Sequence, residues 1–496
     1  MKKNSFRQIV LCAALMLSGA VHTQAAGPVR IIPQPVQMEE RAGVYVLPEK
    51  IVIGYESALQ AQAKYLQELL VQSTGRMATL KEGKAKGDIV LRTDSAGLKA
   101  EGYTLSVTPK RIEITGADVN GAFYGIQSML QLFPAEIYSQ RWQRQVAWEA
   151  PCVEISDAPE RPWRGMMIDV ARYFYDKEFI KKYIDMMAMY KFNKLQFHLI
   201  DDSGWRLEIK KYPRLTEVGA WAGPDEKRLG GFYTQDEIRE MVEYGKVRGV
   251  ELIPEVEFPA HILSAVVAYP WLSCTGLQHE VPTQHFISRD LLCAGKETTL
   301  QFLQDVLEET AELFPSAYIN IGGDEAVYTR WESCPHCQAV MKREGLSKAS
   351  ELQGYLTNKV AEMMKKKNRT LIGQVYEVQG ADAFNSEDYA TAIAVFSKGY
   401  EADPRNTGMA LNLAESYFRS DMYQDGMKIC ANISSLNADK YAEAIAEAQA
   451  KMNMYTNNEV AKLQMANDYD GIIAMAEQLD DAAMAQKITM QASYGK

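Results

Sequence analysis

Two adjacent carboxylic acids, Asp324 and Glu325, follow the apolar and glycine-rich run Tyr318–Gly323. Cleavage of a glycosidic bond needs an acid that protonates the leaving oxygen and a second group that stabilises the oxocarbenium-like centre. Two neighbouring acids after a strand can face different parts of one sugar, and the glycines let a substrate approach the backbone closely. The pair is therefore a candidate for glycosidic chemistry, although Gly-Asp turns are also common without a catalytic role.

Further polar side chains follow other segments that are typical of buried strands. The expected strands are residues 165–168, 194–199, 251–256, 317–321 and 370–372, with periodic helices between them. This alternation predicts an α/β fold with a parallel sheet, and a TIM (β/α)₈-type barrel carries its active site at the carboxyl ends of its strands. The polar side chains that follow the first three strands are Asp169, Arg172, Asp201, Asp202 and His261.

Two helices between these strands are expected to bury one apolar stripe each. The stripes are Phe179, Tyr183, Met186 and Tyr190 in the first helix, and Leu300, Leu303, Leu307, Ala311 and Phe314 in the second. The barrel is predicted to be incomplete, because about five strands are found rather than eight.

Four segments resemble, in this order, the first four barrel strands of the β-N-acetylhexosaminidases of glycoside hydrolase family 20. They are Arg164–Arg172, Phe197–Trp205, Ile253–His261 and Tyr318–Glu325. Residues 121–132 are similar to the end of the family's non-catalytic N-terminal domain. The resemblance extends roughly over residues 27–373, and four motifs in the right order make it highly specific.

The resemblance implies exo-acting, retaining hydrolysis of terminal β-linked GlcNAc or GalNAc in glycans or chito-oligosaccharides, without a cofactor. It implies that Glu325 is the general acid and then the general base, and that Asp324 orients the substrate acetamide, which attacks the anomeric carbon to give an oxazolinium intermediate. Asp201 and His261 would form a relay to Glu325. Arg172 would hold sugar hydroxyls.

Three side chains near this predicted site keep a structural alternative. Trp205 is either a platform for the sugar or a core residue. Asp202 is as well explained by capping the turn after its strand as by catalysis. His198 is expected to be a core histidine.

The chain departs from the family pattern from the fourth strand onward. A Gly-Trp-Asp-Glu-like segment is expected at the fifth strand, where Ile372–Glu377 stands instead, and Asn320 replaces a histidine. The later aromatic residues that wall the acetamide pocket in the family are missing, since the last tryptophan is Trp331. The alternative function is therefore an inactive barrel remnant joined to a helical-repeat module that binds a protein partner.

The predicted domains are a signal peptide at residues 1–25, an α+β domain at 26–158, the truncated barrel at 159–375 and an all-α tail at 381–496. Lys2, Lys3 and Arg7 precede an apolar run that is too short to span a membrane. This pattern predicts export to the periplasm, the cell envelope or the medium. A net charge of −10 argues against nucleic acid as a partner.

The tail shows a repeat of 34 residues between Tyr389 and Tyr423, which is the tetratricopeptide period. A generic helical bundle is the alternative. If the tail and the barrel evolved as one protein, the tail should cover the sheet edge left by the fifth strand. A gene fusion or a shifted reading frame would not have evolved to cover it. If it covers the edge, we expect the side chains of Ile393, Phe396, Leu411 and Leu413 to be shielded there.

Cysteines allow several arrangements in an exported protein. Cys274 and Cys293 bracket one loop and can pair, and Cys334–Cys337 is a CxxC motif. That motif is half a zinc site or a redox pair, or else a loop disulfide or free thiols. Because no second CxxC completes four ligands, the sequence predicts no metal.

Overall fold

The computed structural model describes residues 29–83, 86–224, 227–284 and 287–373, and in the C-terminal part residues 384, 387–402, 406–436, 438–476, 486 and 488–490. The predicted signal peptide and the predicted junction at residues 375–381 lie outside these residues. The chain divides into two compact units. The first comprises residues 1–168, 176–196 and 236–252, and the second comprises residues 169–175, 197–235 and 253–496.

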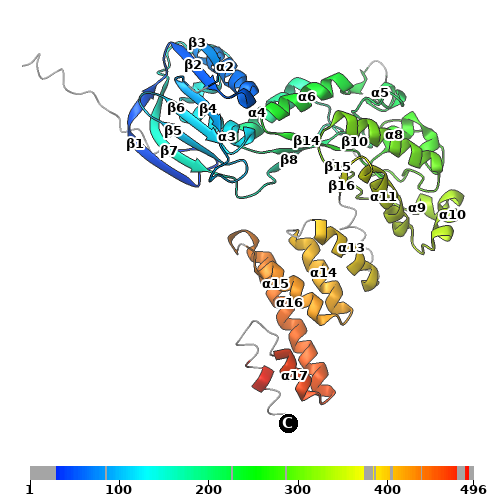
Figure 1. The fold of residues 1–496 in the computed structure, drawn as a ribbon. Helices are drawn as coiled ribbons and strands as arrows, with labels where there is room; N and C mark the ends of the chain where they lie inside the picture. Colours follow the sequence, from blue (N-terminus) through cyan, green and yellow to red (C-terminus); the bar gives the residue numbers. More distant parts are fainter. Residues whose placement is uncertain are drawn as a thin grey trace, which may run out of the picture. The chain divides into compact units, whose positions relative to one another are not determined.

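The first unit contains a mixed sheet of seven strands in the order β1-β7-β5-β6-β4-β2-β3 (Figure 1). The strands are β1 (Gln37–Val46), β2 (Lys50–Tyr55), β3 (Met77–Glu82), β4 (Ile89–Thr93), β5 (Tyr103–Val107), β6 (Ile112–Gly116) and β7 (Glu149–Asp157). Helices α2 (Gln60–Thr74) and α3 (Val119–Leu130) pack against it. The predicted α+β fold of this part of the chain is confirmed.

A second sheet has five strands in the order β8-β9-β14-β15-β16. These are β8 (Gly165–Asp169), β9 (Lys194–His198), β14 (Glu251–Glu255), β15 (Tyr318–Asn320) and β16 (Thr370–Ile372). The pairs β14–β15 and β15–β16 are parallel. All five predicted strands of the barrel are confirmed, and within the described residues the sheet ends at β16.

Helices connect these strands, as the alternating pattern predicts. They are α4 (Lys177–Met189), α6 (Gln235–Val247), α8 (Glu297–Leu313), α9 (Thr329–Ser333), α10 (Pro335–Glu344) and α11 (Ala349–Lys365). In α8 the predicted Leu303 and Leu307 are fully buried.

The predicted buried stripe of α4 is wrong. The helix buries Ile180, Ile184 and Met187, whereas Phe179 and Met186 are 42% and 60% exposed. The two stripes are one residue apart and share the same helical spacing, so periodicity alone could not choose between them. The branched aliphatic side chains face inward in the fold.

Short elements shape the loops after β9 and β14. A small hairpin is formed by β10 (Ile200–Asp201) and β11 (Gly204–Trp205), and α5 (Arg214–Glu217) follows it. A second ribbon pairs β12 (Trp221–Ala222) with β13 (Leu229–Gly230). Helix α7 (Leu263–Ala268) lies in the loop after β14 and is fully buried.

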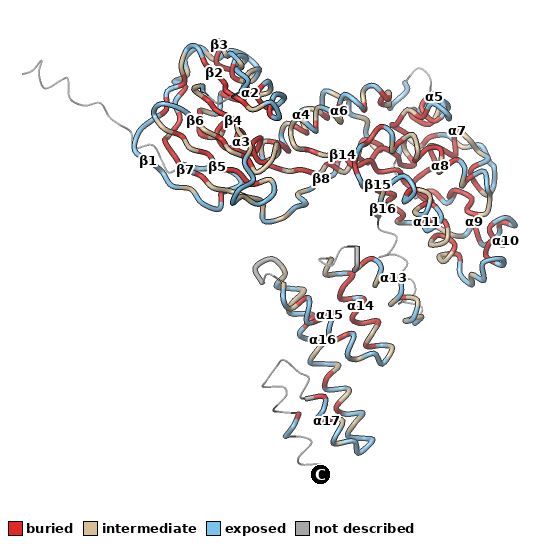
Figure 2. The backbone as a smooth tube through the Cα atoms, in the orientation of Figure 1, coloured by how far each residue is buried: buried red, intermediate tan, exposed pale blue. Residues whose placement is uncertain are grey.

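The C-terminal helices form a core of their own. They are α13 (Tyr389–Ala402), α14 (Thr407–Arg419), α15 (Tyr423–Ser434), α16 (Ala438–Met465) and α17 (Tyr469–Ala476). The helix α14 is largely buried (Figure 2). Phe396, Leu411 and Leu413 belong to a cluster made of residues of these helices, with Ile393 packed against it. These side chains therefore pack on one another, and packing of the tail on the sheet edge stays a prediction.

The helices α13 and α15 begin at Tyr389 and Tyr423, the two positions of the proposed repeat. Their assignment as tetratricopeptide units stays a prediction. In the described part of the chain, every helix is too short or too polar to cross a membrane.

Candidate active site

Hydrogen bonds join the carboxyl ends of four neighbouring strands at one end of the five-stranded sheet. Strands β14 and β15 place Glu255 opposite Asn320. The Val170 N–H donates a hydrogen bond to the carbonyl oxygen of His198 (3.2 Å), and the Leu199 N–H donates one to the carbonyl oxygen of Glu255 (3.3 Å). Side chains that follow these strands therefore project from one end of the sheet, where a barrel carries its active site.

Arg172 is held between two carboxylates at this edge. Its Nη1 lies 2.7 Å from Asp169 Oδ2, and its Nη2 lies 2.8 Å from Asp201 Oδ2. Asp169 Oδ1 also accepts hydrogen bonds from the backbone N–H groups of Ala171 and Arg172 (3.0 Å each). The guanidinium is thus fixed in orientation before any ligand arrives, while 28% of the side chain remains exposed.

Asp201 is completely buried and is surrounded by cationic or hydrogen-bonding groups. Besides Arg172, its Oδ2 lies 3.5 Å from His198 Nε2 and 3.7 Å from His261 Nδ1. Burial alone would raise the pKa of Asp201, but His198, His261 and Arg172 outweigh it and hold the pKa below its usual range. Asp201 is therefore an ionised carboxylate at the centre of the site.

His261 connects these buried acids to the exposed acid Glu325. Its Nδ1 lies 3.7 Å from carboxylate oxygens of Asp201 and Asp202, and its Nε2 lies 3.3 Å from Glu325 Oε2. Burial favours the neutral imidazole, but the carboxylates of Asp202, Asp201 and Asp324 outweigh it and raise the pKa of His261 to about 9. At neutral pH the imidazole is therefore protonated, and its Nε2 lies beside the carboxyl group of Glu325.

The predicted acids Asp324 and Glu325 lie beside His261. One side-chain nitrogen or oxygen atom from each of the three residues lies within 4.8 Å of the others. Glu325 is 49% exposed, whereas His261 is 2% exposed. A buried cation thus sits behind a carboxylate that solvent or a substrate can reach.

Both His261 and Glu325 have a left-handed backbone, with φ of 49° at each residue. This conformation costs a residue with a side chain about 1–3 kcal/mol, and such strain is concentrated at functional sites. The strain is therefore stored at the two residues whose side chains meet.

Glu257 is a buried acid of this site that the sequence analysis missed. It follows β14 and lies against the glycine turn, where its Oε2 accepts a hydrogen bond from the Gly323 N–H (3.2 Å). Burial, followed by the charges of Glu255 and Asp324, raises the pKa of Glu257 well above its usual range. A Cβ at Gly322, where φ is +54°, would overlap the Glu257 carboxylate, which explains why glycine is needed there.

Gln353, also missed, anchors the same turn from the far side. This buried residue of α11 donates a hydrogen bond from Nε2 to the Gly323 carbonyl oxygen (2.6 Å), and its Oε1 accepts one from the Tyr328 hydroxyl (2.5 Å). No local sequence signal marks it, because it lies 30 residues after the turn that it holds.

His198 and Asp202 take structural positions around the site. His198 is 5% exposed and its Nδ1 lies 3.4 Å from Glu255 Oε2. Asp202 accepts hydrogen bonds from the backbone N–H groups of Leu263 (2.9 Å) and Ser288 (3.2 Å). It therefore fixes the loop after β14, rather than the local turn that was the alternative to catalysis.

Trp205 is a core residue, so its alternative assignment as a platform for the sugar is wrong. Trp205 is 0% exposed, its ring lies 6.3 Å from that of Phe302, and its Nε1–H donates to the Leu207 carbonyl oxygen (2.6 Å). A side chain that is fully buried and whose one donor is used inside the core has no surface left for a sugar. Position after a strand could not distinguish this aromatic residue from one that faces solvent.

Residues 162–463 match the family model "Glycosyl hydrolase family 20, catalytic domain", and residues 29–158 match "Glycosyl hydrolase family 20, domain 2". The chain belongs to glycosyl hydrolase family 20. The resemblance in the four strand-end motifs is thereby confirmed. The catalytic-domain match continues through the helices α13 to α15 and into α16.

This family 20 chain is 36% identical over 430 residues to a β-hexosaminidase of Porphyromonas gingivalis, a match that covers 83% of the chain and 55% of the relative. It is 35% identical over 360 residues to a β-hexosaminidase of Vibrio furnissii, covering 70% and 57%. The chain thus spans only somewhat more than half the length of these relatives.

Solved structures of the family share its fold. A β-N-acetylhexosaminidase of Bacteroides fragilis superposes with a TM-score of 0.61 at 36% identity, over 69% of this chain and 66% of that one. A GH20 exo-β-N-acetylglucosaminidase of Vibrio harveyi, solved with N-acetylglucosamine, gives 0.62 at 31% identity, over 69% and 54%. The predicted TIM-barrel-type fold with a preceding α+β domain is confirmed.

Proposed function

We propose that this chain hydrolyses terminal, non-reducing β-linked N-acetylhexosamine residues with retention of configuration. The proposal rests on one observation above all: the exposed Glu325 is held against the buried His261, with Asp324 beside them. Family membership and the names of the relatives support the same activity. GlcNAc- or GalNAc-terminated glycans and chito-oligosaccharides are the proposed substrates.

In the proposed first step the Glu325 carboxylic acid gives its proton to the glycosidic oxygen as the bond from that oxygen to the anomeric carbon breaks. The carbonyl oxygen of the substrate's own acetamide forms the new bond to this carbon, so no enzyme nucleophile is needed. Asp324 accepts the acetamide N–H and stabilises the positive charge of the oxazolinium. Glu325, now a carboxylate, removes a proton from the water that attacks the same carbon and reopens the ring.

Arg172, Asp201 and His261 position these groups. Arg172 is held by Asp169 and Asp201, and its guanidinium would donate hydrogen bonds to sugar hydroxyls. The protonated His261 would donate to Glu325 Oε2 and so fix the direction of its other oxygen toward the leaving group. Asp201 and Asp202 keep His261 charged and oriented.

A chromogenic β-GlcNAc glycoside tests the proposal directly. The wild-type chain should release the chromophore, and Glu325→Gln should lose roughly 10²–10⁴-fold in kcat/KM, the usual contribution of a general acid–base group. Glu332→Gln, an exposed residue of α9, is the matched control and should leave the rate unchanged. A folded wild-type chain without turnover, or equal rates for Glu325→Gln, would overturn it.

A second function has a structural observation in its favour. In the described residues the sheet ends at β16, and the C-terminal helices bury their own core rather than completing the barrel. An inactive barrel joined to a helical module that binds a protein partner would have this form. Binding of GlcNAc or a peptide without hydrolysis would support it, and hydrolysis in the assay above would remove it.

Export is likewise proposed, with the periplasm, the cell envelope or the medium as destination. Its support is the basic start and apolar run of the first residues, which lie outside the described part of the chain. Fractionation of the native host followed by N-terminal sequencing of the mature protein tests it. A chain that keeps Met1 in the cytoplasmic fraction would contradict export.

A further inference from the structure

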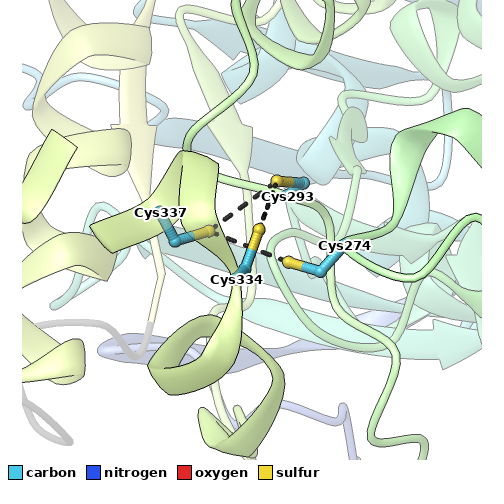
Figure 3. A group of neighbouring side chains, drawn as sticks. All are labelled: Cys274, Cys293, Cys334 and Cys337. Carbon is cyan, nitrogen blue, oxygen red and sulfur yellow. Dashed lines mark hydrogen bonds between the residues drawn. The ribbon is translucent and has the colours of Figure 1, made fainter. Parts of the chain in front are cut away.

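Four cysteines from distant parts of the sequence converge on one point in the segments that follow β14 and β15 (Figure 3). They are Cys274, Cys293, Cys334 and Cys337, and all four sulfur atoms lie within 4.8 Å of one another. Three of the sulfur pairs are 3.7 Å apart: Cys274–Cys337, Cys293–Cys334 and Cys293–Cys337. The sequence expectation that the CxxC motif lacks two further ligands is therefore wrong.

Backbone pairing brings the first two cysteines together. Ser273 and Leu292, the residues that precede Cys274 and Cys293, form an antiparallel bridge. The Cys293 N–H donates a hydrogen bond to the Leu272 carbonyl oxygen (2.7 Å). The two thiols therefore emerge from neighbouring points of a short ribbon that closes a loop of 18 intervening residues.

The second pair comes from the start of helix α10. Cys334 is the residue before the helix, and Cys337 lies in its first turn. A CxxC spacing at a helix start lets both sulfurs face the same point, as in zinc knuckles. Figure 3 shows the sulfurs of Cys334 and Cys337 directed at those of Cys293 and Cys274.

Three of the six sulfur–sulfur distances match the edge of a tetrahedron around one metal ion, and the other three are within 4.8 Å. A zinc–sulfur bond of about 2.3 Å places the sulfurs of a tetrahedral site about 3.8 Å apart. The observed 3.7 Å agrees with this edge, and each of the four sulfurs takes part in at least one such pair. A disulfide would join only two of them, at about 2.0 Å, and would give no reason for a four-fold cluster.

The surroundings suit a closed structural site. Cys293 and Cys337 are fully buried, Cys334 is 4% exposed and Cys274 is partly exposed. A Cβ at Gly295 would overlap the backbone of His336 and Cys337, so glycine lets the two segments touch. The Lys296 ammonium is held by the carbonyl oxygens of Ser273 (2.7 Å) and Trp271 (2.9 Å), which places a cation near a site of excess negative charge.

We propose that Cys274, Cys293, Cys334 and Cys337 bind one zinc ion as a structural tetrathiolate site. Four protein ligands leave no open position for water or substrate, so the site is structural rather than catalytic. Soft thiolates in a tetrahedral set select zinc or iron among the common metals. The inference concerns a different group of side chains from the proposed glycosidase site and does not depend on its activity.

The site would join the two loops that carry His261 and Glu325. Cys274 and Cys293 belong to the loop after β14, and Cys334 and Cys337 follow the loop after β15. Two contacts already link these loops: the Trp331 Nε1–H donates to the Leu292 carbonyl oxygen (2.9 Å), and Arg330 lies 3.4 Å from Asp290. A zinc ion bound beside these contacts would keep the loops of His261 and Glu325 at a fixed spacing.

Metal analysis of the untagged full-length protein tests the proposal. We expect about one zinc ion per chain by plasma mass spectrometry. We also expect thiolate-to-cobalt charge-transfer bands and the visible bands of a tetrahedral tetrathiolate when cobalt replaces zinc. Cys337→Ser and Cys274→Ser should each lose most of the zinc. Cys430→Ser and Cys152→Ser, which alter buried thiols outside the cluster, should keep it.

A thiol count on the wild-type protein keeps the test decisive if the cysteine variants fail to fold. After denaturation with a chelator and no reductant, the cluster should contribute four reactive thiols that are protected in the native protein. Loss of four hydrogens in the intact mass, with the cluster thiols unreactive, would show two disulfides and overturn the proposal. Stoichiometric iron in place of zinc, or a metal-free protein that neither zinc nor cobalt can load, would also overturn it.

Discussion

Two clusters both include residues of the loops after β14 and β15, and they differ in almost every physical respect. The acid cluster (Arg172, Asp201, His261, Asp324 and Glu325) ends at a half-exposed carboxylate, is highly charged and contains two residues with left-handed backbone. The thiol cluster (Cys274, Cys293, Cys334 and Cys337) is mostly buried and is built on a β-bridge and a helix start. The acid cluster holds groups that must contact a substrate, and the thiol cluster holds the surrounding loops.

This difference shows how strain at a functional site can be maintained. The left-handed backbone of His261 and of Glu325 persists only when many surrounding contacts hold it in place. Asp202 fixes the loop of His261, Gln353 and Glu257 fix the turn before Glu325, and the thiol cluster joins the two loops further out. The support is therefore spread over residues that do not touch the reacting atoms.

The largest change in the free energy of unfolding should come from Gly322→Ala, which disturbs the turn beside the acid cluster and leaves the cysteines unchanged. The new Cβ would overlap the Glu257 carboxylate, and alanine disfavours φ of +54°. Strain of about 1–2 kcal/mol and overpacking of about 1–3 kcal/mol should together lower the free energy of unfolding by roughly 2–5 kcal/mol. Denaturant unfolding measures it.

Gly345→Ala is the matched control, because Gly345 has φ of +72° with open space around its missing Cβ. It should lose only the backbone part, about 1–2 kcal/mol. Zinc content should be unchanged in both variants. Equal losses of stability in the two variants would show that Glu257 does not occupy the space beside Gly322.

The next effect concerns pH and the charge on His261. Its folded pKa of about 9 lies above the usual 6.5, so its contribution to stability is complete below pH 6.5 and is lost as the pH rises through 9. The wild-type free energy of unfolding should fall by roughly 2–3 kcal/mol between pH 6.5 and 9. The free energy of unfolding of His261→Gln should change less over the same range. Urea unfolding at several pH values measures it.

His279→Gln is the control for this pH series, since His279 pairs with Asp290 away from the acid cluster. It should keep the wild-type decline in stability with pH. A wild-type protein whose stability is flat over this range would contradict a charged His261 between Asp201, Asp202 and Asp324.

The smallest effect should come from Glu257→Gln. The folded pKa of Glu257 is raised, so the stability that its neutral form provides is complete below about pH 4.5 and is lost as the pH rises through the folded value. Glutamine keeps an acceptor for the Gly323 N–H and cannot ionise. The variant should match wild type near pH 4.5 and gain about 1 kcal/mol relative to it by pH 8.

Melting temperatures of the two proteins at both pH values measure this difference. A variant that is less stable than wild type at pH 8 would show that the ionised Glu257 is needed in the fold. Asp305→Asn, on α8, supplies a contrast. Burial would raise the pKa of Asp305, but Lys211 and Tyr212 outweigh it and lower the pKa. This variant should therefore lose stability relative to wild type at high pH rather than at low pH.

Much of the barrel segment could be predicted because its pattern is local. Each strand is a short apolar run with polar residues directly after it, and neighbouring parallel strands place their carboxyl ends at one edge. Asp201, His261 and Glu325 could therefore be chosen from the sequence. Glu257 and Gln353 could not, because their role depends on which side chain fills the space beside Gly322 and Gly323.

The sequence by itself determined the five strands of the second sheet, the acids at their ends and the family, since these depend on periodicity and on contiguous motifs. Only the tertiary structure decided which stripe of α4 faces inward, that Trp205 is core, and that four cysteines meet. Cys293 and Cys334 are separated by 40 residues, and Cys274 and Cys293 by 18. Loops of this length close through contacts elsewhere in the fold, so spacing in the chain carries no signal of their meeting.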